Sequence, residues 1–96
     1  MEIVKEESES KGRMVAYEGG TEAGEMTFSV ANDFIIVDHT EVAEGYKGQG
    51  VGKKLFWALV DMLRKEDRKV MPLCPYASAM FKKHPDTHDV LRFGSL

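Results

Sequence analysis

The sequence predicts one domain of the α+β class, with a mostly antiparallel central sheet, one parallel strand–helix–strand unit, and helices packed on the sheet. Three observations carry this prediction. Strand-like apolar patterns fill the stretch up to residue 42, an apolar stripe at helical spacing covers 51–65, and another apolar run follows at 69–74. Strands followed by helix, strand and helix are typical of this class, and 96 residues are the length of a single domain.

The stretch up to residue 42 is expected to build the antiparallel part of the sheet. Met26, Phe28 and Val30 alternate with polar residues, which is typical of a strand with one buried face. The run FIIV from Phe34 onward is apolar throughout, so we expect a central strand covered on both faces. Ile3 and Val4 are candidates for the start of a strand, and the charged residues 1–12 are otherwise expected to be a loop and a flexible N-terminus. The strands expected here are 13–17, 26–30 and 34–42, with a glycine-rich turn at 18–24.

The segment 51–65 is expected to be the main helix. Its apolar residues Val51, Leu55, Leu59 and Leu63 recur every four positions, which places them on one face of a helix. Mostly polar and charged residues stand on the opposite face. We therefore expect this helix to pack on the sheet through that apolar stripe.

The rest of the chain is expected to add one strand and one short helix. The apolar run 69–74 follows the main helix, so we expect it to pair parallel with strand 34–42 through a right-handed crossover. Pro72 places this strand at a sheet edge or close to its own end. A short helix is expected at 76–83, and the segment from Pro85 onward is either a second short helix or an irregular tail.

Composition limits the kinds of partner. The net charge is −3, whereas a general nucleic-acid binder normally shows a basic excess. No apolar run approaches the length of about 18 residues that a membrane span needs, and the acidic N-terminus lacks the pattern of a signal peptide. A single cysteine fits a reducing compartment. We therefore expect a cytoplasmic protein with neither a nucleic-acid partner nor a membrane partner.

Glycines crowd the start of the main helix, at Gly48, Gly50 and Gly52, and lysines flank them. The first turn of a helix has free N–H groups and a partial positive charge, so it attracts anions. Glycines let a ligand approach that backbone and adopt conformations that other residues avoid. We interpret the stretch as a phosphate-binding loop in preference to a plain strand–helix connection. The flanking lysines are Lys47, Lys53 and Lys54.

Two familiar nucleotide motifs do not fit this spacing. A Walker A loop that ends at Gly52 needs glycine where Lys47 stands and Ser or Thr where Lys54 stands. A Rossmann fingerprint that begins at Gly48 needs a glycine where Lys53 stands. The Rossmann fingerprint also follows the first strand of a parallel unit, whereas several antiparallel strands precede this loop.

The stretch YKGQGVGKKLFWAL resembles motif A of the GNAT superfamily of acetyl-CoA-dependent N-acetyltransferases, which reads (R/Q)-x-x-G-x-(G/A) between a strand and a helix. The motif falls on residues 47–52, with Lys47 where Arg or Gln is usual; lysine keeps the charge but lacks the guanidinium fork. The segment CPYASAMFKKHP also resembles a small, truncated GNAT subfamily, in which Cys-Pro ends the fifth strand and His-Pro closes the next helix. The similarity covers roughly residues 13–90.

The resemblance implies a GNAT-like fold, acetyl-CoA as co-substrate without a metal, and an amine acceptor that is a small molecule, a peptide or a protein. The loop N–H groups would bind the pyrophosphate, and the end of strand 34–42 would lie along the pantetheine arm. The N–H of Val42 or Ala43 would stabilise the oxyanion. The residues expected to contact the coenzyme are Val42, Ala43, Lys47, Gly48, Gln49, Gly50, Val51, Gly52, Lys53, Cys74 and Phe81.

Acetyl transfer also requires that the amine lose a proton. Glu41, near the end of strand 34–42, is the first candidate base, and His39 is expected on the same face because side chains alternate along a strand. Either residue would take the proton directly or through water. Glu44 is a weaker candidate in the loop. The alternative reading for Glu41 and His39 is a solvent-facing polar residue without a chemical role.

The departing thiolate needs a proton as well. Many GNAT members carry a tyrosine in the helix after the fifth strand, where this chain has Phe81, which donates no proton. Tyr76 lies earlier and on a different face of that helix. Cys74 lies just before the helix, whose N-terminus can activate a thiol. Its candidate roles are acetyl acceptor and proton donor, and the alternative is a small buried hydrophobe.

The sequence also allows two other interpretations, a metal site and a non-catalytic function. His84 and His88 have a spacing compatible with a metal site, but a structural zinc site takes four ligands, and Pro85 and Asp86 resemble a helix start. No metal is therefore expected. The competing function is a non-catalytic module that binds acetyl-CoA or CoA. Because the chain ends at Leu96, soon after the short helix, we expect a shallow, open acceptor site or none.

Overall fold

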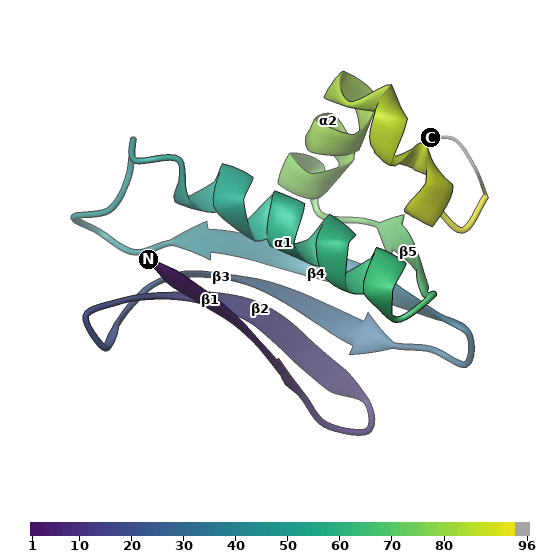
Figure 1. Ribbon diagram of the computed structural model, residues 1–96, viewed down its shortest axis with the longest axis horizontal. Helices are drawn as coiled ribbons and strands as arrows, with labels where there is room; N and C mark the ends of the chain where they lie inside the picture. Colours follow the sequence, from purple (N-terminus) through teal and green to yellow (C-terminus); the bar gives the residue numbers. More distant parts are fainter. Residues whose placement is uncertain (94–96) are drawn as a thin grey trace.

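The computed structural model describes residues 1–93 as a five-stranded sheet with helices over one face (Figure 1). The order of strands, helix, strand and helix is the one that the sequence predicts. Within residues 1–93, none of the helices is both long enough and apolar enough to cross a membrane. The elements are β1 (Glu2–Glu7), β2 (Lys11–Glu18), β3 (Thr21–Val30), β4 (Phe34–Val42), α1 (Val51–Lys65), β5 (Lys69–Pro72), α2 (Pro75–Lys83) and the 3₁₀ helix η1 (Pro85–Val90).

The strands lie in the sheet in sequence order, from β1 at one edge to β5 at the other. The first four strands pair antiparallel. β5 pairs parallel with the first part of β4, from Phe34 opposite Lys69 to Val37 opposite Pro72. A parallel pair needs a crossover connection, and α1 supplies it. The predicted fold class and its one parallel strand–helix–strand unit are therefore confirmed.

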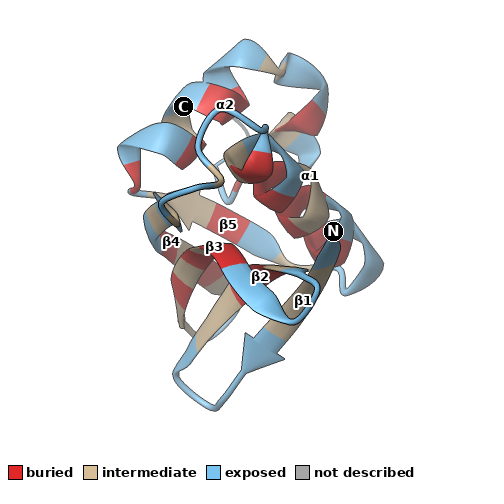
Figure 2. Cartoon of the chain, turned by 90° about the vertical axis from the view of Figure 1, so that its left-hand side faces the viewer, coloured by how far each residue is buried: buried red, intermediate tan, exposed pale blue. Residues whose placement is uncertain are grey.

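Helix α1 covers the sheet through the predicted apolar stripe, and the red, buried residues of Figure 2 lie between α1 and the strands. At Gly24 of β3 the helix comes so close that an added Cβ would lie 2.9 Å from Val51 Cγ1. The buried residues of α1 are Val51, Leu55, Phe56, Leu59, Val60, Met62 and Leu63. The sheet contributes Met14, Ala16, Ala23, Met26, Phe28, Ile35 and Val37 to the same core.

Helix α2 is fixed to α1 by aromatic packing. Phe81 is fully buried and meets Phe56 edge to face, with ring centroids 4.9 Å apart. The chain then continues through η1 back to the sheet, where Leu91 forms a parallel bridge with Val70 of β5. The segment from Pro85 onward is expected from the sequence to be either a short helix or an irregular tail. The structure shows a short helix of the 3₁₀ type. α1, α2 and β5 consequently share one core.

Two features of the N-terminal half differ from the sequence expectation. Residues 1–12 contain β1 and the start of β2, so Ile3 and Val4 do lie in a strand, and the stretch is not the flexible N-terminus that is the other alternative. The glycine-rich turn is confined to Gly19 and Gly20, because Thr21 already begins β3. The strand pattern of β1 is hard to see in the sequence, since charged side chains take the places that apolar ones usually occupy.

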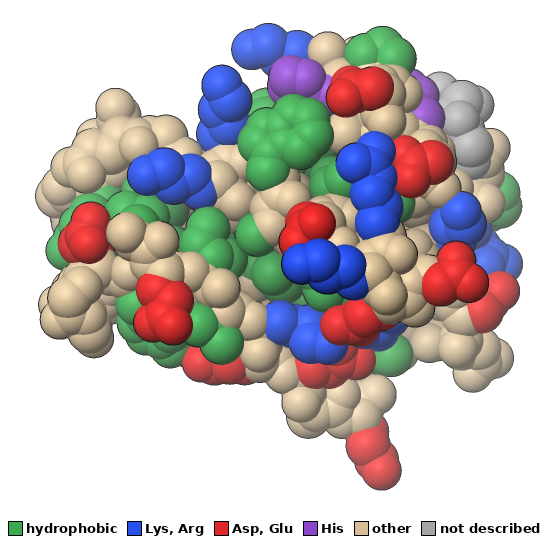
Figure 3. Space-filling model, in the orientation of Figure 1, with side chains coloured by type: hydrophobic (Ala, Val, Ile, Leu, Met, Phe, Trp, Pro, Cys, Tyr) green, Lys and Arg blue, Asp and Glu red, His purple; other side chains and the backbone are tan. Residues whose placement is uncertain are grey.

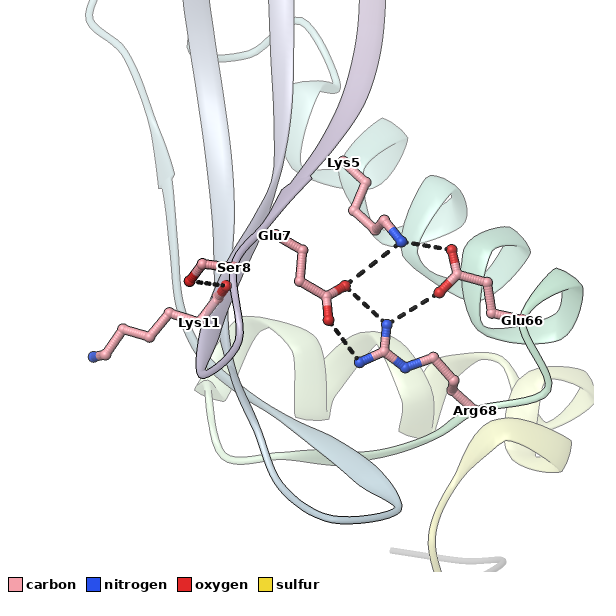
Figure 4. Close-up of polar contacts among 6 residues, drawn as sticks. All are labelled: Lys5, Glu7, Ser8, Lys11, Glu66 and Arg68. Carbon is pink, nitrogen blue, oxygen red and sulfur yellow. Dashed lines mark hydrogen bonds and ion pairs between the residues drawn. The ribbon is translucent and has the colours of Figure 1, made fainter.

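Ion pairs hold β1 to the end of α1 (Figure 4). Lys5 Nζ lies 2.6 Å from Glu66 Oε2 and 3.5 Å from Glu7 Oε1. The guanidinium of Arg68 donates to both carboxylate oxygens of Glu7, at 2.9 and 3.1 Å, and to Glu66 at 3.0 Å. These four residues, the β1–α1 network, connect the outer strand to the far end of the helix.

The apolar run at the start of β4 is covered on one face only, which corrects the expectation of two covered faces. Ile35 and Val37 are fully buried under the helices, whereas Phe34 and Ile36 are half-buried on the other face. The Arg92 guanidinium lies 4.1 Å from the centroid of the Phe34 ring. A charged side chain from the end of the chain thus shields part of the face that no helix covers.

Candidate functional site

The loop between β4 and α1 holds its glycines in conformations that other residues avoid. Gly45, Gly48 and Gly50 have φ values of 91°, 80° and 75°. A Cβ added to any of them would meet nothing within 4 Å. Gln49 Nε2 donates to the carbonyl oxygen of Gly45 at 3.1 Å and so closes the loop on itself. Backbone shape requires these glycines, and the open space around them leaves the loop backbone accessible to a ligand.

Within residues 1–93, no side chain caps the N-terminus of α1 through a hydrogen bond. Gly50 is the N-cap residue and contributes no side chain, and no acidic residue lies in the first turn. Lys53 and Lys54 are exposed, and Lys47 Nζ lies 3.1 Å from Glu44 Oε1. Figure 3 shows Lys or Arg side chains (blue) over the start of α1. The residues present therefore fit a phosphate group.

The third glycine of the motif, Gly52, has a different purpose. It lies inside the first turn of α1, and a Cβ there would lie 3.0 Å from both Cζ and the hydroxyl oxygen of Tyr76. Gly52 thus makes room for a side chain of α2, whereas Gly48 and Gly50 shape the loop. The regular spacing suggests one shared role for the three glycines. In the structure Gly48 and Gly50 have a positive φ, whereas Gly52 is needed for packing against Tyr76.

The edge of β4 becomes free where β5 ends at Pro72, two residues earlier than expected. The N–H groups of Leu73 and Cys74 both donate to the carbonyl oxygen of Val37, at 3.1 and 3.0 Å, and the chain then turns into α2. In the part of the chain that the structure describes, residues 39–42 have no strand beside them on this side. The unpaired edge of residues 39–42 therefore lies beside the start of α2, and we call this break in the β4–β5 pairing the gap.

Thr40 and Cys74 meet at the base of this gap. Thr40 Oγ1 lies 3.3 Å from Cys74 Sγ, and either atom can be the donor. Cys74 is the N-cap residue of α2 and is 3% exposed. This burial agrees with the reading of Cys74 as a small hydrophobe, whereas the polar partner and the helix N-terminus agree with a chemical role. Sequence reasoning missed Thr40, although the alternation that groups His39 with Glu41 places Thr40 on the opposite, helix-covered face.

His39 and Glu41 lie on the sheet face that the helices leave open. Met26 is buried in the core and pairs with Thr40, so the residues on either side of Thr40 point to the other face. Both His39 and Glu41 are exposed. They share a face, as the alternation predicts, but the structure does not bring them together with Cys74. Their exposure equally fits polar residues without a chemical role.

The two candidate oxyanion donors differ in availability. The N–H of Ala43 donates to the carbonyl oxygen of Ala23 at 2.8 Å, so its hydrogen is already engaged. Successive N–H groups of a strand point to opposite sides, so the N–H of Val42 faces the unpaired edge. Of the two, Val42 is the one whose donor is open to the gap.

The two aromatic candidates of α2, Phe81 and Tyr76, differ in burial. Phe81 is fully buried against Phe56 and offers no surface to a coenzyme, which corrects its place among the expected contacts. Tyr76 lies in the first turn of α2 and is 37% exposed. Burial raises the pKa of the Tyr76 phenol, and electrostatic interaction with the neighbouring Cys74 side chain raises it further. The phenol is therefore protonated at neutral pH.

Other places in the fold do not extend this site. An open hollow of about 710 Å³ lies along β1 to β4, and its lining, which includes Arg13, Thr27 and Asp38, contains neither Cys74 nor any residue of the loop between β4 and α1. Across residues 1–93, no three His, Cys, Asp or Glu side chains gather in a way that could hold a metal ion. His88 instead places Nε2 2.7 Å from the carbonyl oxygen of Phe81.

Known proteins match this chain in sequence. Residues 13–90 match the model of the family described as GCN5-related N-acetyl-transferase. NATD1 of Gallus gallus is 34% identical over 56 residues, which are 58% of this chain and 51% of NATD1. NATD1 of Homo sapiens is also 34% identical over 56 residues, which are 50% of that protein. The chain thus spans about half the length of these relatives.

Solved structures match the fold. A GCN5-like protein from Staphylococcus aureus, determined by NMR in solution, has a TM-score of 0.67 and 32% identity, over 97% of this chain and 89% of that one. A ribosomal-protein-alanine N-acetyltransferase from Brucella melitensis biovar Abortus 2308 has a TM-score of 0.68 and 18% identity, over 80% of this chain and 62% of that one. The second likeness concerns the fold alone, whereas the first extends over nearly the whole of both chains.

Proposed function

The chain belongs to the GCN5-related N-acetyltransferase family, and from this premise we propose that it transfers an acetyl group from acetyl-CoA to an amine. One arrangement carries the proposal. An open helix N-terminus preceded by Gly48 and Gly50 stands beside an unpaired strand edge, and the gap along that edge ends at Thr40 and Cys74. A phosphate group fits the helix end, and an extended arm fits the edge.

The loop and the strand edge supply the contacts for the coenzyme. The N–H groups from Gly48 to Gly52 donate to the pyrophosphate, and Lys47 and Lys53 add positive charge. When bound, acetyl-CoA supplies the activated acetyl thioester. The N–H of Val42 donates to the carbonyl oxygen, where negative charge develops during transfer.

We assign removal of the amine proton to Glu41, with His39 as the second candidate. The amine reaches the gap from the open face of the sheet, where the Glu41 carboxylate is exposed. Glu41→Gln is expected to lower kcat by about 100-fold with little change in KM, because general-base catalysis contributes on this scale. Steady-state kinetics measures this effect. Glu9→Gln, at an exposed position between β1 and β2, is the matched control, and equal losses in both variants contradict the assignment.

Cys74 is proposed either to accept the acetyl group or to donate a proton to the departing thiolate. In the first route Sγ would attack the thioester and its proton would go to the leaving coenzyme thiolate. The amine would then take the acetyl group from Cys74, and the amine proton would return to Sγ. The chain has one cysteine, so mass spectrometry after incubation with acetyl-CoA alone is decisive. An acetyl adduct that Cys74→Ala abolishes supports the covalent route, whereas amine acetylation without an adduct supports direct transfer.

Titration with acetyl-CoA tests the binding site itself. The amide resonances of residues 42–54 are expected to shift most, because this segment holds the loop and the end of β4. CoA without the acetyl group is expected to shift the same loop residues. The absence of shifts in this segment would contradict every function proposed here.

A non-catalytic module that binds acetyl-CoA or CoA is the second candidate function. Phe81 favours it, because a buried phenylalanine stands where a proton donor is expected. The two functions share the binding site and differ in turnover. Polyamines, lysine peptides and peptides with free N-termini form a suitable acceptor panel. Acetylation of any acceptor or hydrolysis of the thioester supports the enzyme, and binding without either supports the module.

We also propose an acceptor class and a location for the protein. The acceptor is an amine on a small molecule, a peptide or a protein. A cytoplasmic location without a nucleic-acid or membrane partner is supported by the net charge of −3 and by the single cysteine.

A further inference from the structure

Tyr76 lies between the phosphate-binding loop and the base of the gap. It belongs to the first turn of α2, and its ring lies against the first turn of α1. The ring fills the space that a Cβ on Gly52 would take, since Cζ and the hydroxyl oxygen are both 3.0 Å from that position. The ring therefore has no room to move back toward α1.

The base of the gap is closed. Thr40 Oγ1 and Cys74 Sγ are 3.3 Å apart, and the backbone just below is tied by the hydrogen bond from Cys74 N–H to the Val37 carbonyl oxygen at 3.0 Å. Cys74 is almost fully buried. A ligand that enters along the free edge of β4 consequently ends at the Thr40–Cys74 contact.

We propose that Tyr76 is a specificity-determining residue that restricts the acyl donor to the two-carbon acetyl group. This assignment rests on the proposed function, because the acyl end of the donor must lie in the gap between the Tyr76 ring and the Thr40–Cys74 contact. A longer acyl chain has to push the ring away from its contact with Gly52 toward solvent, or separate Thr40 from Cys74. Tyr76 remains 37% exposed, as expected for a side chain that lines an entrance and is not part of the core.

The wild-type protein provides the first test. Acetyl-, propionyl- and butyryl-CoA are compared with one acceptor from the panel, or by thioester hydrolysis where no acceptor reacts. We expect kcat/KM to fall at least about tenfold for each added methylene, because one methylene group in a fitted pocket has an effect of this size. Equal use of butyryl-CoA and acetyl-CoA would overturn the assignment whatever the variants do.

Substitution of Tyr76 provides the second test. Tyr76→Ala is expected to raise the propionyl-to-acetyl ratio of kcat/KM by about tenfold, whereas Tyr76→Phe keeps the ring and should keep the wild-type ratio. Phe93→Ala removes another exposed aromatic ring, beyond the Leu91 bridge to β5, and is the matched control. A ratio in Tyr76→Ala within about twofold of wild type contradicts the assignment.

Two measurements separate this assignment from the proposed function. Circular dichroism and CoA-induced amide shifts establish that each variant is folded and binds the coenzyme. If Tyr76→Ala does not fold, Tyr76→Leu replaces it and the wild-type series still decides. Failure of the wild type to transfer or hydrolyse any acyl group overturns the proposed function and this assignment together. Transfer without chain-length discrimination overturns this assignment alone.

Discussion

Glycine meets three different physical requirements in this chain. Gly48 has a φ of 80° in open space, so only its backbone conformation requires glycine. Gly52 makes room for the Tyr76 ring, and Gly24 permits the close approach of α1 to β3. A substitution at each position therefore has a different consequence, although the sequence shows only the letter G.

Gly24→Ala is expected to destabilise the fold. The new Cβ would lie 2.9 Å from Val51 Cγ1 and 2.9 Å from the carbonyl oxygen of Glu41, and the oxygen belongs to the sheet backbone. Overpacking of this kind lowers the free energy of unfolding by about 1–3 kcal/mol. Urea-induced unfolding measures the change. Gly48→Asn is the control, since asparagine tolerates a positive φ; equal stability of the two variants would show that α1 can shift away.

The elements differ in how well the sequence predicts them. The sequence predicts α1 with its observed bounds, Val51–Lys65, because its apolar stripe is regular and involves only residues that are close in the chain. β1 does not, because its contacts to Glu66 and Arg68 join residues far apart in the chain. The glycines of the loop predict a phosphate site from the sequence alone, since helix N-termini have a local signature. The Thr40–Cys74 contact has no local signature, as it depends on where β5 leaves β4.

The β1–α1 network is expected to hold the outer strand in place. Arg68→Ala removes the paired hydrogen bonds to Glu7 and the bond to Glu66, both at a partly exposed position. The free energy of unfolding should fall by about 1 kcal/mol at most. Hydrogen exchange in β1 should accelerate more than exchange in β3, because among residues 1–93 β1 is an edge strand paired with β2, whereas β3 is paired on both sides.

Lys65→Ala is the matched control for the network. It removes an ion pair with Asp61, 3.0 Å long, on the exposed side of α1, and should leave exchange in β1 unchanged. If Arg68→Ala also leaves β1 exchange at the wild-type rate, backbone pairing with β2 is sufficient to hold the strand.

Several carboxylates of the folded protein are paired with cations, so its free energy of unfolding depends on pH. Hydrogen bonds from Arg68 lower the pKa of Glu7, those from Lys5 lower the pKa of Glu66, and those from Arg64 lower the pKa of Asp89. The ordinary values are 4.5 for the glutamates and 3.8 for the aspartate, and in the folded protein all three pKa values are below them. A group whose pKa is lowered by folding stabilises the fold above its unfolded pKa, and this contribution is lost as pH falls through the folded pKa.

We therefore expect the free energy of unfolding to be nearly constant from neutral pH down to 4.5 and to fall progressively below it. Urea midpoints measured across this range test the expectation. Salt should weaken the dependence, because the paired groups are partly exposed and the ions screen them. The double variant Glu7→Gln and Glu66→Gln removes two of the titrating groups while keeping their size. It should be less stable than wild type at neutral pH, and the two stabilities should converge as pH falls. A constant difference between the two proteins below pH 4.5 would mean that other groups govern acid unfolding.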